Sequence, residues 1–208
     1  MEALFSVDYR RATWTCFCLG CCYGFSAIEP VNVYSSTLLI KILEVSEGSF
    51  PLSVKSGVLI INTANFVGAF LAAIASRYVG RKTILSIGHA NMCLCHALVG
   101  VFMYFEMFMG VFVMLLVYVI TFQMSTGNVS WIYFAEVCVD SGMGIVLAAV
   151  QASNILMAFT VSYKIDSPLR FEGTFWLYSG LNVCCLIFLV VFLRETKGLS
   201  PSELRHLY

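Results

Sequence analysis

Three short segments of this chain, far apart in the sequence, carry opposite charges that could form ion pairs. They are "SRYVGRKTILSIG", "WIYFAEV" and "RETKG", and their charged candidates are Arg77, Arg81, Lys82, Glu136 and Glu195. Cations at the start of a helix oppose the helix dipole, so we expect Arg81 and Lys82 to lie near carboxylates. We therefore predict an ion-pair cluster that joins three helix ends. The alternative is three independent charged anchors at a membrane surface.

A second chemical candidate is Glu29, which lies inside an apolar stretch and is followed by Pro30. A carboxylate within a membrane span costs about 3 kcal/mol unless it is paired, hydrated or protonated. The proline frees a backbone carbonyl and bends the helix. Glu29 could therefore couple proton movement to solute movement. It could equally be a carboxylate that faces a lumen or another subunit and is neutralised by burial.

The elements that would position these residues are membrane helices. Hydrophobic residues make up 60% of the chain, charged residues 12%, and the mean hydropathy is +0.87. A water-soluble domain rarely has this composition. The charges are clustered, and the apolar stretches between them are roughly 20 residues long, enough for a helix to cross a hydrocarbon core of about 30 Å. The period-2 alternation of barrel strands is absent, which favours helices.

We predict an all-α, polytopic membrane protein with six transmembrane helices in a single bundle that comprises residues 1–208. The predicted spans are 13–39, 56–75, 83–105, 108–133, 143–163 and 174–193. A cleavable signal peptide is not expected, because Glu2 and Asp8 stand where a basic segment would be required.

The distribution of Lys and Arg predicts that both termini are cytoplasmic, or lie in the equivalent inner compartment. Six spans place both ends on one side, and that side receives eight cations against four on the other. The eight are Arg10, Arg11, Arg77, Arg81, Lys82, Arg194, Lys197 and Arg205, and the four are Lys41, Lys55, Lys164 and Arg170.

Cysteine, histidine and net charge indicate neither a metal site nor a nucleic-acid partner. Eight of the nine cysteines fall inside predicted helices, where cysteine behaves as a small apolar residue. His89 and His96 could meet a polar lumen, although packing roles are commoner. The net charge is zero. We find no nucleophile, metal cluster or phosphate loop, so we predict no enzymatic activity and no cofactor.

Five segments, in order, resemble the sugar porters, a branch of the major facilitator superfamily. "VGRKTILSIG", "WIYFAEV" and "RETKGLSPSEL" are similar to the family signatures "GRRxLLxxG", "PWxxxAE" and "PETKGxSxEE". "YSSTLL" and "INTANFVGAF" resemble parts of the seventh and eighth helices. The similarity runs from about Arg11 to the C-terminus and covers the second half of a twelve-helix architecture.

The resemblance implies one half of a major facilitator fold and a polar sugar site. In such transporters two six-helix bundles bind the substrate between them and move against one another. The residues at family sugar-contact positions are Asn62, Trp131 and Asn154, with Gln123 where the family usually has glutamate. Amides suit hydroxyls, and an aromatic ring suits the apolar face of a pyranose. Structural alternatives are hydrogen bonds between helices for the Asn residues and an interfacial position for Trp131.

Several family positions are changed. "QQLSGIN" of the seventh helix is "YGFSAIE" here, so both glutamines are absent and Glu29 replaces asparagine. "GPxPW" of the tenth helix is "GNVSW", in which Asn128 and Ser130 replace the prolines, so we expect a straighter helix. Arg77 stands where an acidic residue precedes "GRR", and Met143 stands where arginine is usual.

Two functions follow from these observations. The first is a sugar-porter-like half that moves a sugar or polyol when paired with a second six-helix bundle. The second is a non-transporting structural or accessory subunit of a larger membrane complex, derived from a transporter half. The lost glutamines and prolines favour the second, and Asn62, Trp131 and Glu136 favour the first.

Overall fold

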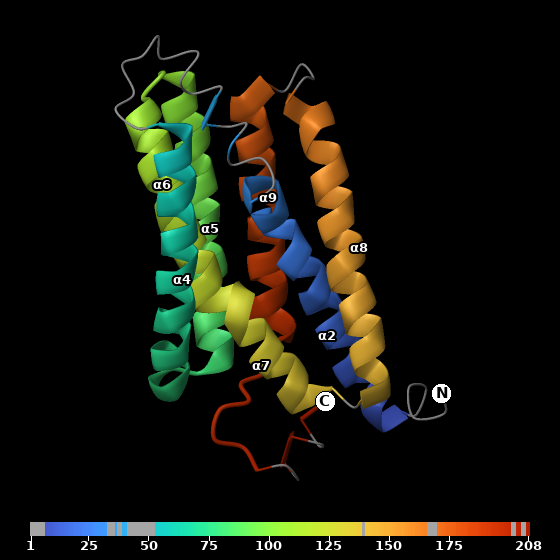
Figure 1. Ribbon diagram of the computed structural model, residues 1–208. Coiled ribbons are helices and arrows are strands. Elements are labelled where there is room, and N and C mark those ends of the chain that lie inside the picture. Colours follow the sequence, from blue (N-terminus) through green and yellow to red (C-terminus); the bar gives the residue numbers. More distant parts are fainter. Residues whose placement is uncertain are drawn as a thin grey trace.

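The computed structural model describes residues 7–32, 36, 39–40, 53–138, 140–165, 170–200, 203–204 and 207–208. Within this part the chain is helical and contains no strand. The helices are α2 (Val7–Phe25), α4 (Val54–Tyr78), α5 (Arg81–Tyr104), α6 (Phe108–Phe122), α7 (Asn128–Val137), α8 (Asp140–Ile165) and α9 (Arg170–Phe192), with a π-helical segment η1 (Gln123–Gly127) between α6 and α7. The start of α2 and the C-terminus lie at the same end of the bundle, which we call the termini end (Figure 1).

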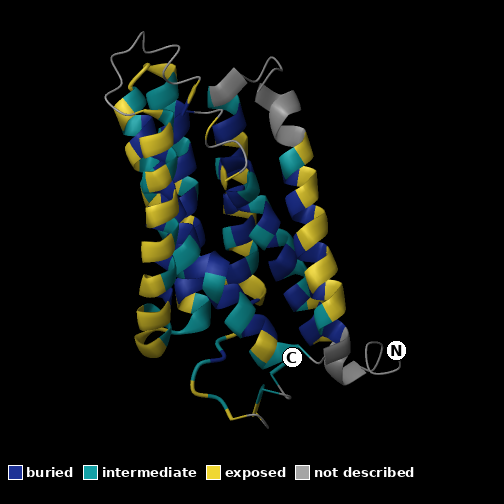
Figure 2. Ribbon diagram, in the orientation of Figure 1, coloured by how far each residue is buried: buried dark blue, intermediate teal, exposed yellow. Residues whose placement is uncertain are grey.

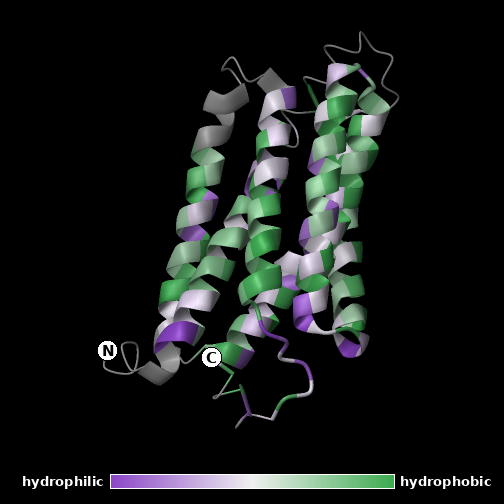
Figure 3. Ribbon diagram, turned by 180° about the vertical axis from the view of Figure 1, so that it is seen from behind, coloured by the Kyte–Doolittle hydropathy of each residue, from purple (hydrophilic) through white to green (hydrophobic). Residues whose placement is uncertain are grey.

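Most of the predicted spans are confirmed as long apolar helices. Five helices of the described part are long and apolar enough to cross a membrane, over Val54–Tyr78, Arg81–Tyr104, Phe108–Val137, Gly142–Phe159 and Glu172–Phe192. The predicted span 13–39 includes most of α2, and some of its later residues lie outside the described part. Lys41 and Arg205, which were used to predict the orientation, also lie outside it. Most of the helical residues are hydrophobic, and hydrophilic residues are found at the α4–α5 turn and in the segment after α9 (Figure 3).

The most extensive helix packing is between α5 and α9, between α2 and α8, and between α5 and α6. Buried residues face the inside of the bundle, while the outer faces of α4 and α8 are exposed (Figure 2). Phe66 on α4 is 74% exposed and Phe159 on α8 is 81% exposed. Large apolar side chains in such positions require lipid or another protein surface as their surroundings.

Small residues bring α2 and α8 close together. Gly20 and Gly24 are four residues apart on α2, the spacing that lets membrane helices approach closely. A methyl group on Gly24 would meet the side chain of Ser153 and lie 2.8 Å from its backbone carbonyl carbon. The Ser153 hydroxyl donates to Ala149 O on its own helix at 2.7 Å, so it cannot move freely. The backbones can therefore pack at this distance because position 24 is glycine.

The first helical pass changes direction after α2. Ala27 has φ 70°, a left-handed conformation that is uncommon for an L-residue. The break is held by hydrogen bonds: the Ser26 hydroxyl donates to Tyr23 O at 2.6 Å, and the Tyr118 hydroxyl donates to Ser26 O at 2.9 Å. Helical structure resumes at residue 28. Glu29 therefore lies directly beyond a broken helix.

The two histidines of α5 are buried and belong to a polar network between helices. His89 lies with Nδ1 at 3.1 Å from Asn182 Oδ1 and Nε2 at 3.2 Å from Thr126 Oγ1. Asn182 Nδ2 is 3.4 Å from His96 Nδ1, and the His96 ring packs against Tyr118 at 4.4 Å between centroids. These contacts join α5 to α6, α9 and η1, which is the packing role considered from the sequence.

We expect Gly24→Ala to lower the stability of the bundle by about 1–3 kcal/mol, the usual cost of overpacking. The added methyl group must displace the Ser153 side chain or separate α2 from α8. The measurement is the midpoint of thermal unfolding in detergent, followed by size-exclusion chromatography.

Gly144→Ala is the matched control, because a methyl group there would meet nothing within 4 Å. Equal midpoints for the two variants would contradict close packing of α2 and α8 at Gly24.

Candidate functional site

A half-buried ion pair joins α5 to α7 at the termini end. Arg81 Nη2 lies 2.7 Å from Glu136 Oε1, and Arg81 Nε donates to the same oxygen at 3.2 Å. The side chains of Arg81 and Glu136 are 17% and 23% exposed. The Thr196 hydroxyl donates to Glu136 Oε2 at 2.6 Å, which brings in the segment after α9. Both oxygens of Glu136 are therefore occupied.

Glu195 completes this cluster by accepting hydrogen bonds at the start of α5. Its Oε1 accepts the Arg81 backbone N–H at 2.7 Å and the Thr196 and Lys197 N–H groups at 3.1 Å each. Gly80 is the N-cap residue of α5 and has no side chain that could accept a hydrogen bond from the first turn. A methyl group at this position would collide with the Glu195 carboxylate. Position 80 thus leaves room for a carboxylate from a distant segment to cap the helix. We call Arg81, Glu136, Glu195 and Thr196 the termini-end charge cluster.

The structure does not bring Lys82 and Arg77 into this cluster. Lys82 is one residue beyond Arg81, about 100° around the helix, and its Nζ donates to Val190 O on α9 at 2.9 Å. Arg77 lies exposed in the last turn of α4 and forms no ion pair within the described part of the chain. A cation in the last turn is favourably placed for the helix dipole without a carboxylate.

The C-terminal segment folds back onto the same end of the bundle. The Tyr208 hydroxyl lies 2.5 Å from the Tyr133 hydroxyl of α7 and accepts the Arg194 backbone N–H at 3.0 Å. The Arg194 guanidinium carbon lies 5.6 Å from the centre of the Tyr208 ring. Burial raises the pKa of the Tyr208 hydroxyl above its usual value. This contact was not predicted, because a terminal tyrosine has no sequence signature for it.

A group of three amides lies at the π-helical segment. Gln123 Nε2 donates to Asn65 Oδ1 on α4 at 2.9 Å. Asn128 Nδ2 donates to the Gln123 backbone carbonyl at 2.6 Å and lies 3.4 Å from Gln123 Oε1. Of the three, Gln123 was predicted as a site residue, whereas Asn65 was missed. Its position three residues after Asn62, on the neighbouring side of α4, was the available signal.

The predicted sugar-contact residues have different surroundings. Trp131 is half-buried, with its rings 5.8 Å from the Tyr23 ring and 5.6 Å from the Phe134 ring. Asn62 is exposed on α4. Asn154 is buried on α8, and its Oδ1 has no hydrogen-bond partner among the described residues. Glu29 is half-buried and has no ion pair within the described part. No described contact joins all five predicted residues.

The helix that carries Gln123 and Trp131 is interrupted, although it lacks the family prolines. Gln123–Gly127 form a π turn, after which α7 runs obliquely to α6 (Figure 1). The Ser125 hydroxyl donates to Thr121 O at 2.6 Å within this segment. The expectation of a straighter helix is therefore wrong in this respect. A π turn displaces backbone hydrogen bonds, as a proline does, and such turns are frequent at functional sites.

Comparison with known proteins assigns the chain to a family. The model of the family "Sugar (and other) transporter" matches residues 1–208. The chain belongs to this family. The arabinose-proton symporter of Bacillus subtilis (strain 168) is 29% identical over 155 residues, which cover 72% of this chain and 33% of the symporter. The facilitated trehalose transporter Tret1 of Apis mellifera ligustica is 28% identical over 190 residues, which cover 86% of this chain and 37% of that protein.

The fold is also that of a solved sugar transporter. The inward open conformation of the xylose transporter XylE from E. coli superposes with a TM-score of 0.81 at 22% sequence identity, covering 100% of this chain and 43% of that one. The chain therefore spans less than half the length of the relatives it matches. It has the architecture of one half of a major facilitator transporter and is an integral, multi-pass membrane protein of the sugar transporter family.

A double-mutant cycle on Arg81 and Glu136 tests the ion pair of the termini-end charge cluster. We expect Arg81→Gln and Glu136→Gln each to lower the unfolding midpoint in detergent. The double variant should lose less free energy of unfolding than the two single variants lose together. The difference, which is the coupling energy of the pair, should be about 1 kcal/mol after allowance for partial exposure.

Arg77→Gln is the control, because Arg77 is a cation at the same end of the bundle with no ion pair in the described part. Additive losses at positions 81 and 136 would show that the two side chains do not interact.

Proposed function

We propose that this chain is one six-helix half of a transporter that moves a sugar or a related polyol when it is paired with a second six-helix bundle. The family match and the half-length coverage support this proposal. Alternating access in this fold requires two bundles that move against one another around a central site. The second bundle could belong to a separate chain, to a second copy or to the same longer polypeptide.

The observation that carries the proposal is the group of amides beside aromatic rings. Asn128 and Trp131 are three residues apart on α7, so they lie on neighbouring sides of one helix face. Tyr23 packs on Trp131 at 5.8 Å and on Phe122, next to Gln123, at 5.4 Å. Amides offer donors and acceptors to hydroxyl groups, and rings of this kind pack against the apolar face of a sugar.

We expect Asn65→Ala to weaken sugar binding by about tenfold, because the substitution removes the acceptor that orients the Gln123 amide. The measurement is the concentration dependence of radiolabelled pentose and hexose uptake into vesicles that contain the chain with its second bundle.

Thr63→Ala is the matched control on the same helix. Thr63 is exposed, and its hydroxyl donates within α4 to Leu59 O at 2.9 Å. Equal uptake curves for the Asn65 and Thr63 variants would contradict a sugar site at the amides.

A second candidate function is that of a non-transporting accessory subunit. The two positions that hold glutamines in the family are Tyr23, whose ring packs on Trp131, and Gly24, which packs against Ser153. Neither offers an amide to a sugar. Vesicles that contain the intact complex but show no uptake of any pentose, hexose or polyol would favour this candidate.

Glu29→Gln separates proton-coupled transport from a structural role. If Glu29 accepts and releases the coupled proton, the variant should lose pH-gradient-driven accumulation, while exchange of sugar across the membrane and assembly with the second bundle persist. If Glu29 instead pairs with a donor from a partner, removing its charge should weaken co-purification. Unchanged accumulation and unchanged co-purification would exclude both roles.

A further inference from the structure

A pocket of about 560 Å³ lies at the termini end between α2 and the segment after α9. It lies away from the group of amides, and the transport proposal does not use it. Four basic residues contribute to its wall, namely Arg10, Arg11, Lys82 and Arg194. Glu195 is the one acidic side chain among the lining residues, which also include Tyr208 at the end of the printed sequence. The pocket therefore combines four basic side chains with one acidic side chain.

The basic side chains of the pocket form no ion pair with any carboxylate whose side chain the structure describes. Glu195 already accepts three backbone N–H groups through Oε1 at the start of α5. Lys82 donates to the Val190 carbonyl, and Arg194 donates to the Leu207 carbonyl, so both cations contact neutral groups.

Arg10 and Arg11 are exposed in the first turns of α2 and form no ion pair among the residues whose side chains the structure describes, which begin at Arg10. The positive end of the α2 dipole lies beside them and adds to the potential. A site with this surplus of positive charge favours an anion.

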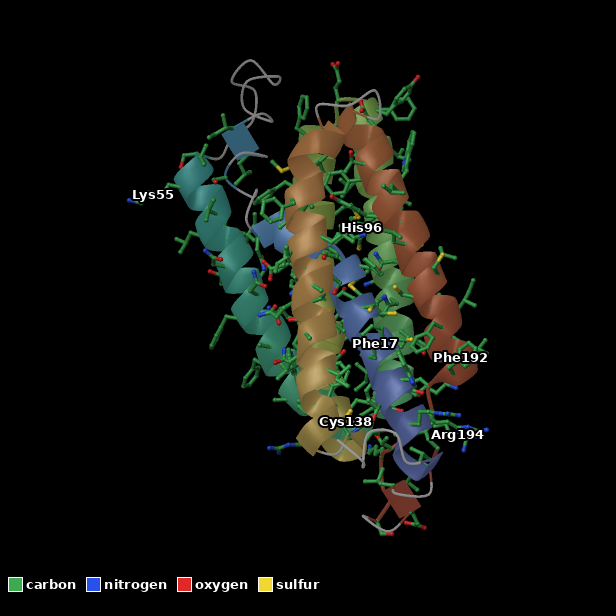
Figure 4. All side chains as sticks on the ribbon, turned by 90° about the vertical axis from the view of Figure 1, so that its right-hand side faces the viewer. Phe17, Lys55, His96, Cys138, Phe192 and Arg194 are labelled. Carbon is green, nitrogen blue, oxygen red and sulfur yellow. The ribbon has the colours of Figure 1, made fainter. Side chains whose placement is uncertain are left out.

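The same pocket has an apolar wall toward the middle of the bundle. Trp14 lies one turn beyond Arg10 on α2 and is 58% exposed, and its ring meets Phe17 at 5.3 Å. On α9, Val191 and Phe192 also line the pocket and are 64% and 60% exposed. Figure 4 shows Arg194 at the termini end and Phe192 above it, nearer the middle of the bundle. Cations at the helix ends therefore border exposed aromatic and aliphatic side chains one turn deeper.

We propose that this pocket binds an anionic phospholipid of the leaflet at the termini end. The headgroup phosphate contacts Arg10, Arg11, Lys82 and Arg194, and an acyl chain lies along Trp14 and Phe192. Basic pockets between membrane helices suit lipid phosphates in this way, because long basic side chains reach the interface while aromatic rings stay at the level of the acyl chains. A free phosphate ion would use the cations but would leave the apolar wall exposed.

Quenching of Trp14 by brominated lipids tests this site directly. The chain has three tryptophans, so Trp131→Phe and Trp176→Phe leave Trp14 as the sole fluorophore. The protein is placed in phosphatidylcholine vesicles that contain equal mole fractions of dibrominated phosphatidylglycerol or dibrominated phosphatidylcholine. We expect the anionic lipid to associate about fivefold more strongly, the ratio that one well-placed cation provides.

The double variant Arg10→Gln/Arg11→Gln should reduce the preference for the anionic lipid, so that the association ratio falls toward one. The double variant Arg10→Lys/Arg11→Lys keeps the positive charge, so its ratio should stay above that of the glutamine variant. Lys55→Gln is the matched control, because Lys55 is an exposed cation at the opposite end of the bundle (Figure 4). Size-exclusion chromatography of each variant checks that it remains folded.

Three results would overturn the proposal. Equal quenching by both lipids in the parent protein would show no preference for an anionic headgroup. Loss of the preference in inorganic phosphate, but not in chloride of the same ionic strength, would identify a free-anion site instead. Absence of quenching by either lipid would show that protein, rather than lipid, covers Trp14.

Discussion

The ion pair between Arg81 and Glu136, extended by Glu195 and Thr196, fixes the positions of three helix ends that are distant in the sequence. Apolar packing alone determines such positions weakly in a membrane, because lipid is as apolar as the helix surfaces. Charge-assisted hydrogen bonds in a half-buried setting have defined geometry, so they specify how α5, α7 and the segment after α9 meet. The C-terminal segment depends on the same arrangement, since Tyr208 contacts Tyr133 of α7 and the backbone of Arg194.

Polar groups within the bundle gather where the helices are irregular. A regular helix satisfies its own backbone in lipid, and irregular backbone is tolerated where protein or a cavity surrounds it. The break at Ala27 is held by Ser26 and Tyr118, and the π turn at Gln123–Gly127 adjoins Asn65, Asn128 and His89. Two helical passes of the described part are therefore interrupted beside residues that could contact a solute. Broken helices serve this purpose in other secondary transporters.

Sequence patterns could predict the helices and part of the charge cluster, but not the amide group. Long apolar stretches leave helices as the only reasonable spanning element, and the motif with Arg81 indicated carboxylate partners. The sequence did not show that Lys82 and Arg77 lie outside the charge cluster, because this depends on the direction in which each side chain leaves its helix. Asn65 was missed although its spacing from Asn62 was available, because the sequence does not show which neighbouring helix a polar residue faces. The π turn has no sequence signal of its own. Tyr208 and the basic pocket arise from chain segments that meet only in three dimensions.

The central claim is that this bundle works as half of a two-bundle transporter, and native mass spectrometry of the protein purified in mild detergent tests it most directly. We predict a complex in which each 23.1 kDa copy of the 208-residue sequence is joined to one further six-helix bundle, whether from a second copy, a separate chain or an extension of the same polypeptide. A single unpartnered bundle, or an assembly with subunits that carry no six-helix bundle, would contradict the account.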